Sequence, residues 1–373
     1  MRIRRWAAIA GAIPASLLVA GYGALSYISG TVLWWLPPEN LTVVSWGEDY
    51  QRAQMVSLFH PFTDETGVDV DATIYGGGLN EVRSQVASGT IEWDVVDFDL
   101  ADAAAACREG LLEQIDPATL PAAEDGTSAA ADFVPGAVGS CWIGSAVYSQ
   151  IIAYAPGKFP EAPRTAADFF DLARFPGKRG LRDSGPQYNL ALALLADGVS
   201  PGEVYSLLAT EEGAARAFAK LDSIKPSILW WRRPNEPIDM LTRGDVAMTT
   251  ALNGRVFAAE TSGGGIKPIW DGQLYSLDVF GIPRGTSRLE RALEFVRYVT
   301  STGPLAEQSR WVPYGPARHS AAALAGENDK GMAMRPFLPT APENFGNALL
   351  MDPDWWAANG EALQERWTAW RGQ

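Results

Sequence analysis

The chain has 373 residues, which is too long for one ordinary hydrophobic core, so we expect about two lobes. Hydrophobic residues make up 47% of the chain and charged residues 20%, which excludes a disordered protein and fits a globular one. The net charge of −14 at pH 7 gives a surface that repels phosphates, which argues against nucleic acid as a partner.

The N-terminal segment, residues 1–38, has the pattern of an export signal. Three arginines lie within the first five residues, and no other charged residue follows until Glu39. The uncharged stretch exceeds the ~20 residues that span a bilayer, so a retained membrane anchor stays open as an alternative. Pro14 and several glycines would weaken a permanent helix there, which favours cleavage. We expect a periplasmic protein.

The next part of the chain alternates strands with helices. Apolar or alternating runs predict strands at 41–46 ("LTVVSW"), 68–75 ("VDVDATIY") and 93–99 ("WDVVDFD"). Helical periodicity fills the intervals at 48–67 and 79–89. This order predicts an α/β fold with a parallel, helix-covered sheet.

The second half of the chain continues the alternation. Capping-box spacing predicts helix starts at Thr165 with Asp168 and at Ser287 with Glu290. The expected helices are 165–175, 189–198, 211–224 and 287–301, and the expected strands are 245–252 and 274–283.

Residues at strand ends are the candidate ligand contacts, because ligands of open α/β sheets lie outside the carboxyl ends of the strands. These segments are rich in aromatic and acidic residues, as a small-molecule cleft requires. In "TTALNGRV" (249–256), Asn253-Gly254 is typical of a turn that presents Arg255. The strand-end segments are 46–50, 75–78, 97–99, 253–255 and 275–278.

Two cysteines, Cys107 and Cys141, lie 34 residues apart. In an exported chain we expect them to form one disulfide, with two buried thiols as the alternative. Two cysteines and the scattered His60 and His319 form no ligand cluster, so we expect no metal and no cofactor.

None of the catalytic motifs that the sequence matches has the surrounding residues that its chemistry requires. "GVSPG" at 198–202 matches Gly-x-Ser-x-Gly, but it follows a helix, and Pro201 would distort the required turn. The glycine triplets at 76–78 and 263–265 lack the spacing of phosphate-binding loops. We therefore expect a protein that is not an enzyme, with a secreted or membrane-anchored enzyme as the competing class.

The order of segments resembles the periplasmic solute-binding proteins of ABC importers, in the spermidine/putrescine branch. The resemblance runs from about Leu41 to the C-terminus. It rests on segments such as "LTVVSWGEDYQRAQ", "FTDETGVDVDATIY", "IEWDVVDF", "CREGLLEQID", "FPGKRGLRD", "DVAMTTALNGRV" and "WDGQLYSLDVFGIP". It implies a monomer with two α/β lobes, joined by hinge crossings, that closes on a small molecule and delivers it to an inner-membrane permease or serves a sensor.

The resemblance also implies domain boundaries and site residues. Lobe 1 would comprise 40–153 plus 255–305, and lobe 2 would comprise 154–254 plus 306–373, with crossings near 152–155, 252–255 and 301–308. In polyamine binders, aromatic rings hold the methylene chain and carboxylates fix the ammonium ends. The candidate ligand residues, from strand ends and resemblance together, are Trp46, Glu48, Asp49, Tyr50, Tyr75, Asp97, Asp99, Asp183, Trp230, Trp231, Asn253, Arg255, Tyr275 and Asp278.

Two departures from the polyamine branch leave the ligand open. Leu252 and Arg255 stand where that branch has a tryptophan and an acid, and "SGPQYN" after Asp183 lacks a carboxylate. A polyamine would require Arg255 to pair with an acid such as Asp97, Asp99 or Asp278. The alternative is a carboxylate-bearing ligand, an amino acid or an opine-like conjugate, anchored by Arg255.

Overall fold

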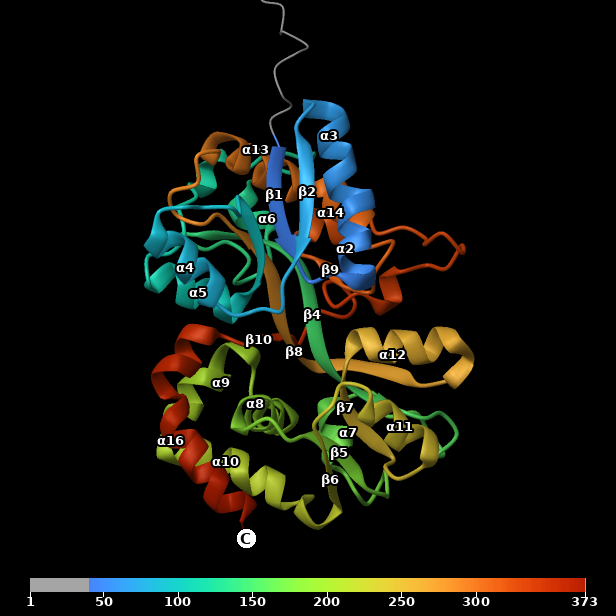
Figure 1. The fold of residues 1–373 in the computed structure, drawn as a ribbon. Coiled ribbons are helices and arrows are strands. Elements are labelled where there is room, and N and C mark those ends of the chain that lie inside the picture. Colours follow the sequence, from blue (N-terminus) through green and yellow to red (C-terminus); the bar gives the residue numbers. More distant parts are fainter. Residues whose placement is uncertain (1–39, 373) are drawn as a thin grey trace, which may run out of the picture. The chain divides into compact units, whose positions relative to one another are not determined.

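The computed structural model describes residues 40–372, which form two α/β lobes (Figure 1). The expected export segment, 1–38, lies outside the described residues. Within 40–372, none of the helices combines the length and the apolar composition needed to cross a membrane.

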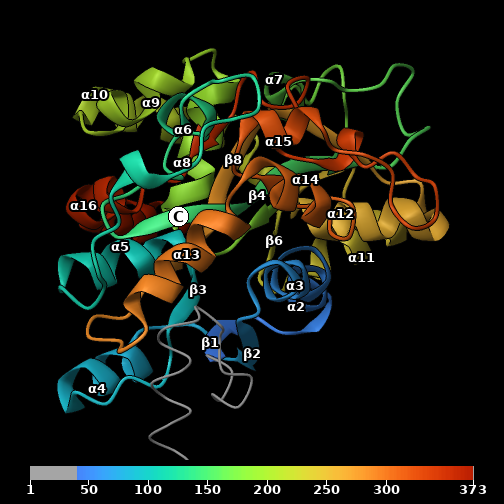
Figure 2. The same ribbon diagram turned by 90° about the horizontal axis from the view of Figure 1, so that it is seen from above.

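The first lobe is built on three parallel strands, β1 (Asn40–Ser45), β2 (Asp69–Ile74) and β3 (Val95–Asp99). The predicted β-α-β-α-β order is confirmed. Figure 1 and Figure 2 show α4 and α5 on one side of these strands and α2 and α3 on the other. The apolar residues of β1 and β3 are fully buried, as expected for strands covered on both faces.

The second lobe has its own parallel strands, β5 (Arg179–Arg182), β6 (Ile228–Trp231) and β7 (Met248–Leu252). Because the three strands are parallel, their carboxyl ends lie at one edge of the sheet. The whole sheet has the strand order β2-β1-β3-β8-β4-β7-β5-β6, so the two lobes share one continuous ladder.

Two long antiparallel strands, β4 (Trp142–Tyr154) and β8 (Lys267–Gly281), run through both lobes. The end of β8 pairs with β3, whereas the end of β4 pairs with β7. The short β10 (Leu349–Leu350) pairs with the middle of β8, and β9 (Gly315–Pro316) pairs with β4. Figure 1 shows β4 and β8 passing from one group of elements into the other.

The packing of apolar side chains suggests other lobe boundaries than the expected ones. Val256, Ala259 and Ile266 pack with Trp231 of the second lobe. Ala317 packs in the core of the first lobe. We therefore propose that the chain crosses within β4, β8 and β10, so that 255–273 stays in the second lobe and 306–348 in the first.

The helix starts show one confirmed and one wrong capping prediction. Thr165 and Asp168 form the expected capping box, but the helix ends at Phe170 because Asp171 bonds the next backbone N–H groups instead. The box at Ser287 is wrong, since the Thr286 hydroxyl accepts the N–H of Arg288 and the helix begins at Leu289 without a side-chain cap.

Helices cover the sheet in both lobes, and a π-helical segment at Met55–Phe59 joins α2 to α3 into the long helix predicted there. The helices are α2 (Glu48–Gln54), α3 (His60–Thr66), α4 (Asn80–Ser88), α5 (Leu100–Arg108), α6 (Ala129–Asp132), α7 (Ala166–Phe170), α8 (Pro186–Ala196), α9 (Pro201–Leu208), α10 (Glu211–Asp222), α11 (Glu236–Arg243), α12 (Asn253–Ala259), α13 (Leu289–Val299), α14 (Thr302–Gln308), α15 (His319–Ala323) and α16 (Pro353–Arg371).

Candidate functional site

Three carboxylates gather where β3 and β8 pair in the first lobe. Asp99 and Asp278 are register partners, and Asp97 lies two residues before Asp99. Asp97 is fully buried, and its Oδ2 accepts hydrogen bonds from Gln54 Nε2 (2.7 Å) and Ser45 Oγ (3.3 Å), while its Oδ1 has no partner. Within residues 40–372, none of the three carboxylates has a basic group within 4.0 Å.

We define Asp97, Asp99 and Asp278 as the acid cluster, and burial shifts the pKa of Asp97 and of Asp278. Burial raises the pKa of Asp97 to about 7, although hydrogen bonds from Gln54 and Ser45 partly oppose the rise. Burial also raises the pKa of Asp278 well above its usual range, and the negative charges of Asp97 and Asp99 add to the effect. Without a cation, protons on Asp97 and Asp278 relieve the repulsion, and a bound cation would instead favour the ionised forms of these acids.

Tyrosines surround the acid cluster. The Tyr148 hydroxyl donates to Asp99, and the buried Tyr50 hydroxyl has no hydrogen-bond partner among the described residues. The Tyr50 ring lies 5.6 Å from that of Tyr314. Burial raises the pKa of Tyr50 and Tyr148, and the nearby carboxylates raise it further, so both stay neutral hydrogen-bond donors.

Trp46 follows β1 and adds another aromatic ring near these tyrosines. Its ring centroid lies 5.0 Å from that of Tyr75, and its buried indole N–H has no partner among residues 40–372. The Tyr75 hydroxyl is already used, since it donates to the backbone carbonyl of Asp97 at 2.8 Å. Gly77 has a φ of 82°, and a Cβ there would lie 3.0 Å from the Trp46 ring, so glycine is required beside it.

The two acidic neighbours of Trp46 do not join the acid cluster. Glu48 and Asp49 are exposed, and Asp49 pairs with Arg52 at 3.2 Å. Glu48 has a φ of 51°, the only positive φ of a non-glycine residue in the described chain. Such strain clusters at functional sites, and Glu48 begins α2 two residues after Trp46.

An arginine without a carboxylate partner marks the second lobe. Arg182 ends β5, and its guanidinium lies 5.1 Å from the Tyr188 ring and 5.7 Å from the Trp231 ring. It has no ion pair within the described residues. Burial raises the pKa of Tyr188, and the charges of Arg182 and Asp99 shift it in opposite directions. Tyr188 therefore lies within electrostatic reach of both lobes' charged groups.

"TTALNGRV" does not form the turn that Asn253-Gly254 suggests. Helix α12 begins at Asn253 directly after β7, and Gly254 is not among the residues with positive φ. Asn253 is buried, with its Oδ1 accepting the N–H of Ser149 (2.9 Å) and its Nδ2 donating to the Pro313 carbonyl (2.6 Å). Its amide links three segments and is not free for a ligand.

Arg255 lies in the first turn of α12 with an exposed side chain. Within 40–372 it has no ion pair, so the pairing with Asp97, Asp99 or Asp278 that a polyamine ligand would require is not formed. Burial and the charge of Asp278 raise the pKa of Tyr314, and the charge of Arg255 partly offsets this. The pKa of Tyr314, like that of Tyr188, is thus shifted in opposite directions by an acid and an arginine.

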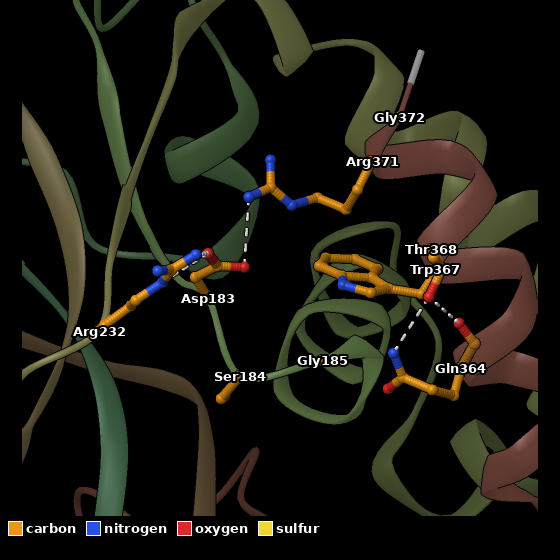
Figure 3. A pocket seen from close by; sticks show the side chains of 9 residues that line it. All are labelled: Asp183, Ser184, Gly185, Arg232, Gln364, Trp367, Thr368, Arg371 and Gly372. Carbon is orange, nitrogen blue, oxygen red and sulfur yellow. Dashed lines mark hydrogen bonds and ion pairs between the residues drawn. The ribbon is translucent and has the colours of Figure 1, made fainter.

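Asp183 lines a separate polar cavity of about 590 Å³ at the carboxyl ends of β5 and β6. Figure 3 shows Arg232 and Arg371 reaching Asp183 from two sides, at 2.8 and 3.2 Å. Burial alone would raise the pKa of Asp183, but the bond from Arg232 and the charge of Arg371 outweigh it and lower the pKa. The carboxylate is already neutralised by two guanidinium groups.

The remaining candidates serve packing. Trp230 stacks against Arg371, whose guanidinium lies 3.9 Å from its ring, and Trp231 is buried in the core between β6 and α11. Tyr275 is 2% exposed, and its hydroxyl donates to the Pro135 carbonyl. The structure therefore brings Trp46, Tyr50 and the acid cluster together. Four further residues near them are not among those predicted from the sequence: Arg182, Tyr148, Tyr188 and Tyr314.

The expected disulfide is confirmed. Cys107, near the end of α5, is bonded to Cys141, which immediately precedes β4. The bond ties the helix that Asp99 caps to the strand that carries Tyr148, so it holds two elements of the site together.

Comparison with known proteins identifies the family. The family model for "bacterial extracellular solute-binding protein" matches residues 57–339. The chain is 38% identical over 332 residues to the γ-aminobutyric acid-binding protein of Pseudomonas aeruginosa, covering 89% of this chain and 91% of that relative.

The chain is also similar to the solved Atu4243 γ-aminobutyric acid (GABA) receptor, with 29% identity, a TM-score of 0.70, and coverage of 89% of this chain and 97% of that one. An ABC transporter substrate-binding protein from Bradyrhizobium japonicum USDA 110 gives 30% identity, a TM-score of 0.73, and coverage of 89% and 99%. The chain belongs to the bacterial extracellular solute-binding family, as the substrate-binding component of an ABC transporter.

Proposed function

We propose that the protein binds a zwitterionic amino acid whose amine and carboxylate are separated by a short carbon chain, such as GABA. It would collect this ligand in the periplasm and deliver it to an inner-membrane permease. The observation that carries the proposal is that the site contains both acidic groups without a cation and basic groups without an anion. The acid cluster lacks a cation, and Arg182 and Arg255 lack an anion, within the described residues.

The acid cluster suits the ligand's ammonium group. Three neighbouring carboxylates in a poorly solvated site are destabilised without a cation, and an ammonium ion relieves that repulsion. Trp46 and Tyr50 add aromatic faces, and each favourable cation–π contact contributes about 0.5–2 kcal/mol. The first lobe would therefore hold the amine.

The arginines suit the ligand's carboxylate. A guanidinium group binds a carboxylate with two parallel hydrogen bonds, and within 40–372 neither Arg182 nor Arg255 spends this capacity on a carboxylate of the protein itself. The charges of Asp99 and Arg182 shift the pKa of Tyr188, and the charges of Asp278 and Arg255 shift the pKa of Tyr314. Both poles are thus near common residues, which supports a small ligand that bridges them.

A polyamine fits these charges less well. A diammonium ligand needs a second anionic group, and Asp183, the acid expected in that role, is already paired with Arg232 and Arg371. The arginines would also repel a second ammonium group. The GABA-binding relatives support the same choice.

The test is isothermal titration calorimetry with four ligands that share a four-carbon skeleton. GABA carries one amine and one carboxylate, putrescine two amines, succinate two carboxylates, and butyrate one carboxylate. We expect GABA to bind and each of the others to bind at least about 100-fold more weakly, because each leaves a charged group unpaired. Putrescine binding that equals or exceeds GABA binding would overturn the proposal.

A further inference from the structure

One buried amide on the crossing strand β4 has no partner among the described residues. Gln150 is 3% exposed, and neither its Oε1 nor its Nε2 forms a hydrogen bond. It is the only residue in 40–372 whose buried side chain leaves two polar atoms unpaired. Each such group destabilises a folded protein, so an apolar residue of the same shape would be more stable here.

The position of Gln150 in the ladder places it on the same face of β4 as a residue of the candidate site. It pairs with Leu252 of β7 on one side and Leu274 of β8 on the other, where the lobes join. Alternate residues of a strand share a face, so Gln150 lies on the face of Tyr148, whose hydroxyl donates to Asp99.

The opposite face of the crossing is already satisfied. The Ser149 hydroxyl donates to Gln273, and the Gln273 amide donates to the carbonyls of Pro339 and Asn344. Within residues 40–372, the amide of Gln273 on one face thus has hydrogen-bond partners, whereas the amide of Gln150 on the other face has none. Burial and then the charges of Asp99 and Tyr188 raise the pKa of Tyr148, so charged and polar groups of both lobes act on the face that Tyr148 shares with Gln150.

We propose that Gln150 contacts the ligand and selects for zwitterions. Its Nε2 would donate to the ligand's carboxylate and its Oε1 would accept from the ligand's ammonium group. Only a ligand with both a donor and an acceptor satisfies both ends of the amide, whereas a diamine or a dicarboxylate leaves one end unpaired. This inference rests on the proposed function and adds a selectivity residue to it.

The test is Gln150→Met, which keeps the length of the side chain and removes its hydrogen bonds. We expect the unliganded variant to melt at the same temperature as the wild type or higher, because an unpaired amide is removed. We expect its affinity for GABA to fall about 10- to 100-fold, as for lost hydrogen bonds to charged groups. Loss of affinity without loss of stability is a result that a structural glutamine would not give.

A matched control is Gln85→Met. Gln85 is also buried, but its Oε1 accepts the N–H groups of Glu92 and Trp93, and its Nε2 donates to Glu81. This variant should lose stability and keep the affinity of the wild type. Gln150→Asn serves as a second variant, since it stays polar but withdraws the amide by one methylene, and it too should weaken GABA binding.

Other results of these measurements would overturn either the role of Gln150 or the proposed function. Wild-type affinity in both Gln150 variants, or a Gln150→Met protein that does not fold, would overturn the inference, since the amide would then have partners within the protein. A wild-type protein that binds none of the four-carbon ligands would instead overturn the proposed function, and the inference with it.

Discussion

Asp97 illustrates what the site costs the unliganded protein. Its carboxylate is fully buried, and only Gln54 and Ser45 of the described residues donate to it. A buried acid whose pKa is raised keeps its proton when folded and loses it when unfolded, so the fold becomes less stable as pH rises from about 4 to 7. Such instability is expected where ligand affinity depends on unpaired charge.

The raised pKa values predict that GABA affinity depends on pH. An ammonium group binds the ionised acid cluster, so below the Asp97 pKa of about 7 a proton competes with the ligand. Affinity should therefore fall as pH decreases from about 8 to about 6, and binding should release protons. Calorimetry in two buffers of different ionisation enthalpy measures both effects.

Asp97→Asn is the control for that prediction. It removes one of the two acids whose pKa is raised, so the pH dependence near neutrality should weaken while some affinity remains through Asp99 and Asp278. A wild-type affinity that stays flat between about pH 6 and pH 8 would contradict the assignment of the ammonium group to the acid cluster.

Among the elements, α12 shows how a turn signal can be misleading. Asn253-Gly254 predicts a turn from local preferences, but the Asn253 amide bonds Ser149 and Pro313 and fixes the first helical turn instead. Because Gly254 is helical, Gly254→Ala should stabilise the protein by up to about 1 kcal/mol, measured by urea unfolding.

The comparison for this variant is Gly67→Ala. Gly67 ends α3 with a φ of 74°, and a methyl group added there would meet no neighbouring atom, so only backbone strain opposes the substitution. We expect it to lower the free energy of unfolding by about 1 kcal/mol. A Gly254→Ala protein that loses as much stability as Gly67→Ala would contradict the helical conformation at position 254.

The disulfide joins α5 to the start of β4, two elements that carry site residues. Its loop of about 35 residues predicts a stabilisation of about 3–4 kcal/mol. The double variant Cys107→Ser/Cys141→Ser should lose this amount in urea unfolding under oxidising conditions. Addition of a reductant should destabilise the wild type to the same extent and leave the variant unchanged; equal stability of both proteins would refute the estimate.

The sequence predicts regular elements well and the crossings poorly. Strands β1, β2 and β3 follow clear apolar patterns, and the structure contains all three. The early part of β8 escapes prediction because Pro268 and Gly272 resemble a turn. In the structure Pro268 pairs in register with Ala153, and a register shift against β4 accommodates Gly272 within the strand. Long-range pairing decides such segments, and local preferences do not show it.

Some residues of the candidate site could be predicted from the sequence and others could not. The rule that ligands bind at strand ends predicts Trp46, Asp99 and Asp278, which the structure brings into one region. The same rule includes Asn253 and Tyr275, whose polar groups are already bonded within the protein. An unpaired amide such as that of Gln150 cannot be recognised in a strand from sequence, because only the folded neighbours reveal whether partners exist.

For the whole molecule, ligand binding across the crossing strands predicts a change of shape. The proposed ligand bridges the acid cluster of the first lobe and the arginines of the second, so binding should draw the lobes together. Small-angle X-ray scattering should show a smaller radius of gyration with saturating GABA and no change with butyrate. An identical scattering curve with and without GABA would exclude closure.

The central claim is that one small zwitterion bridges the two charge groups. A crystal structure with bound GABA tests it most directly. We predict the ligand's nitrogen at hydrogen-bond distance, about 2.7–3.2 Å, from Asp99 or Asp278, and its carboxylate against Arg182 or Arg255. A ligand in the opposite orientation, or one bound instead in the cavity beside Asp183 and Arg371, would contradict the account.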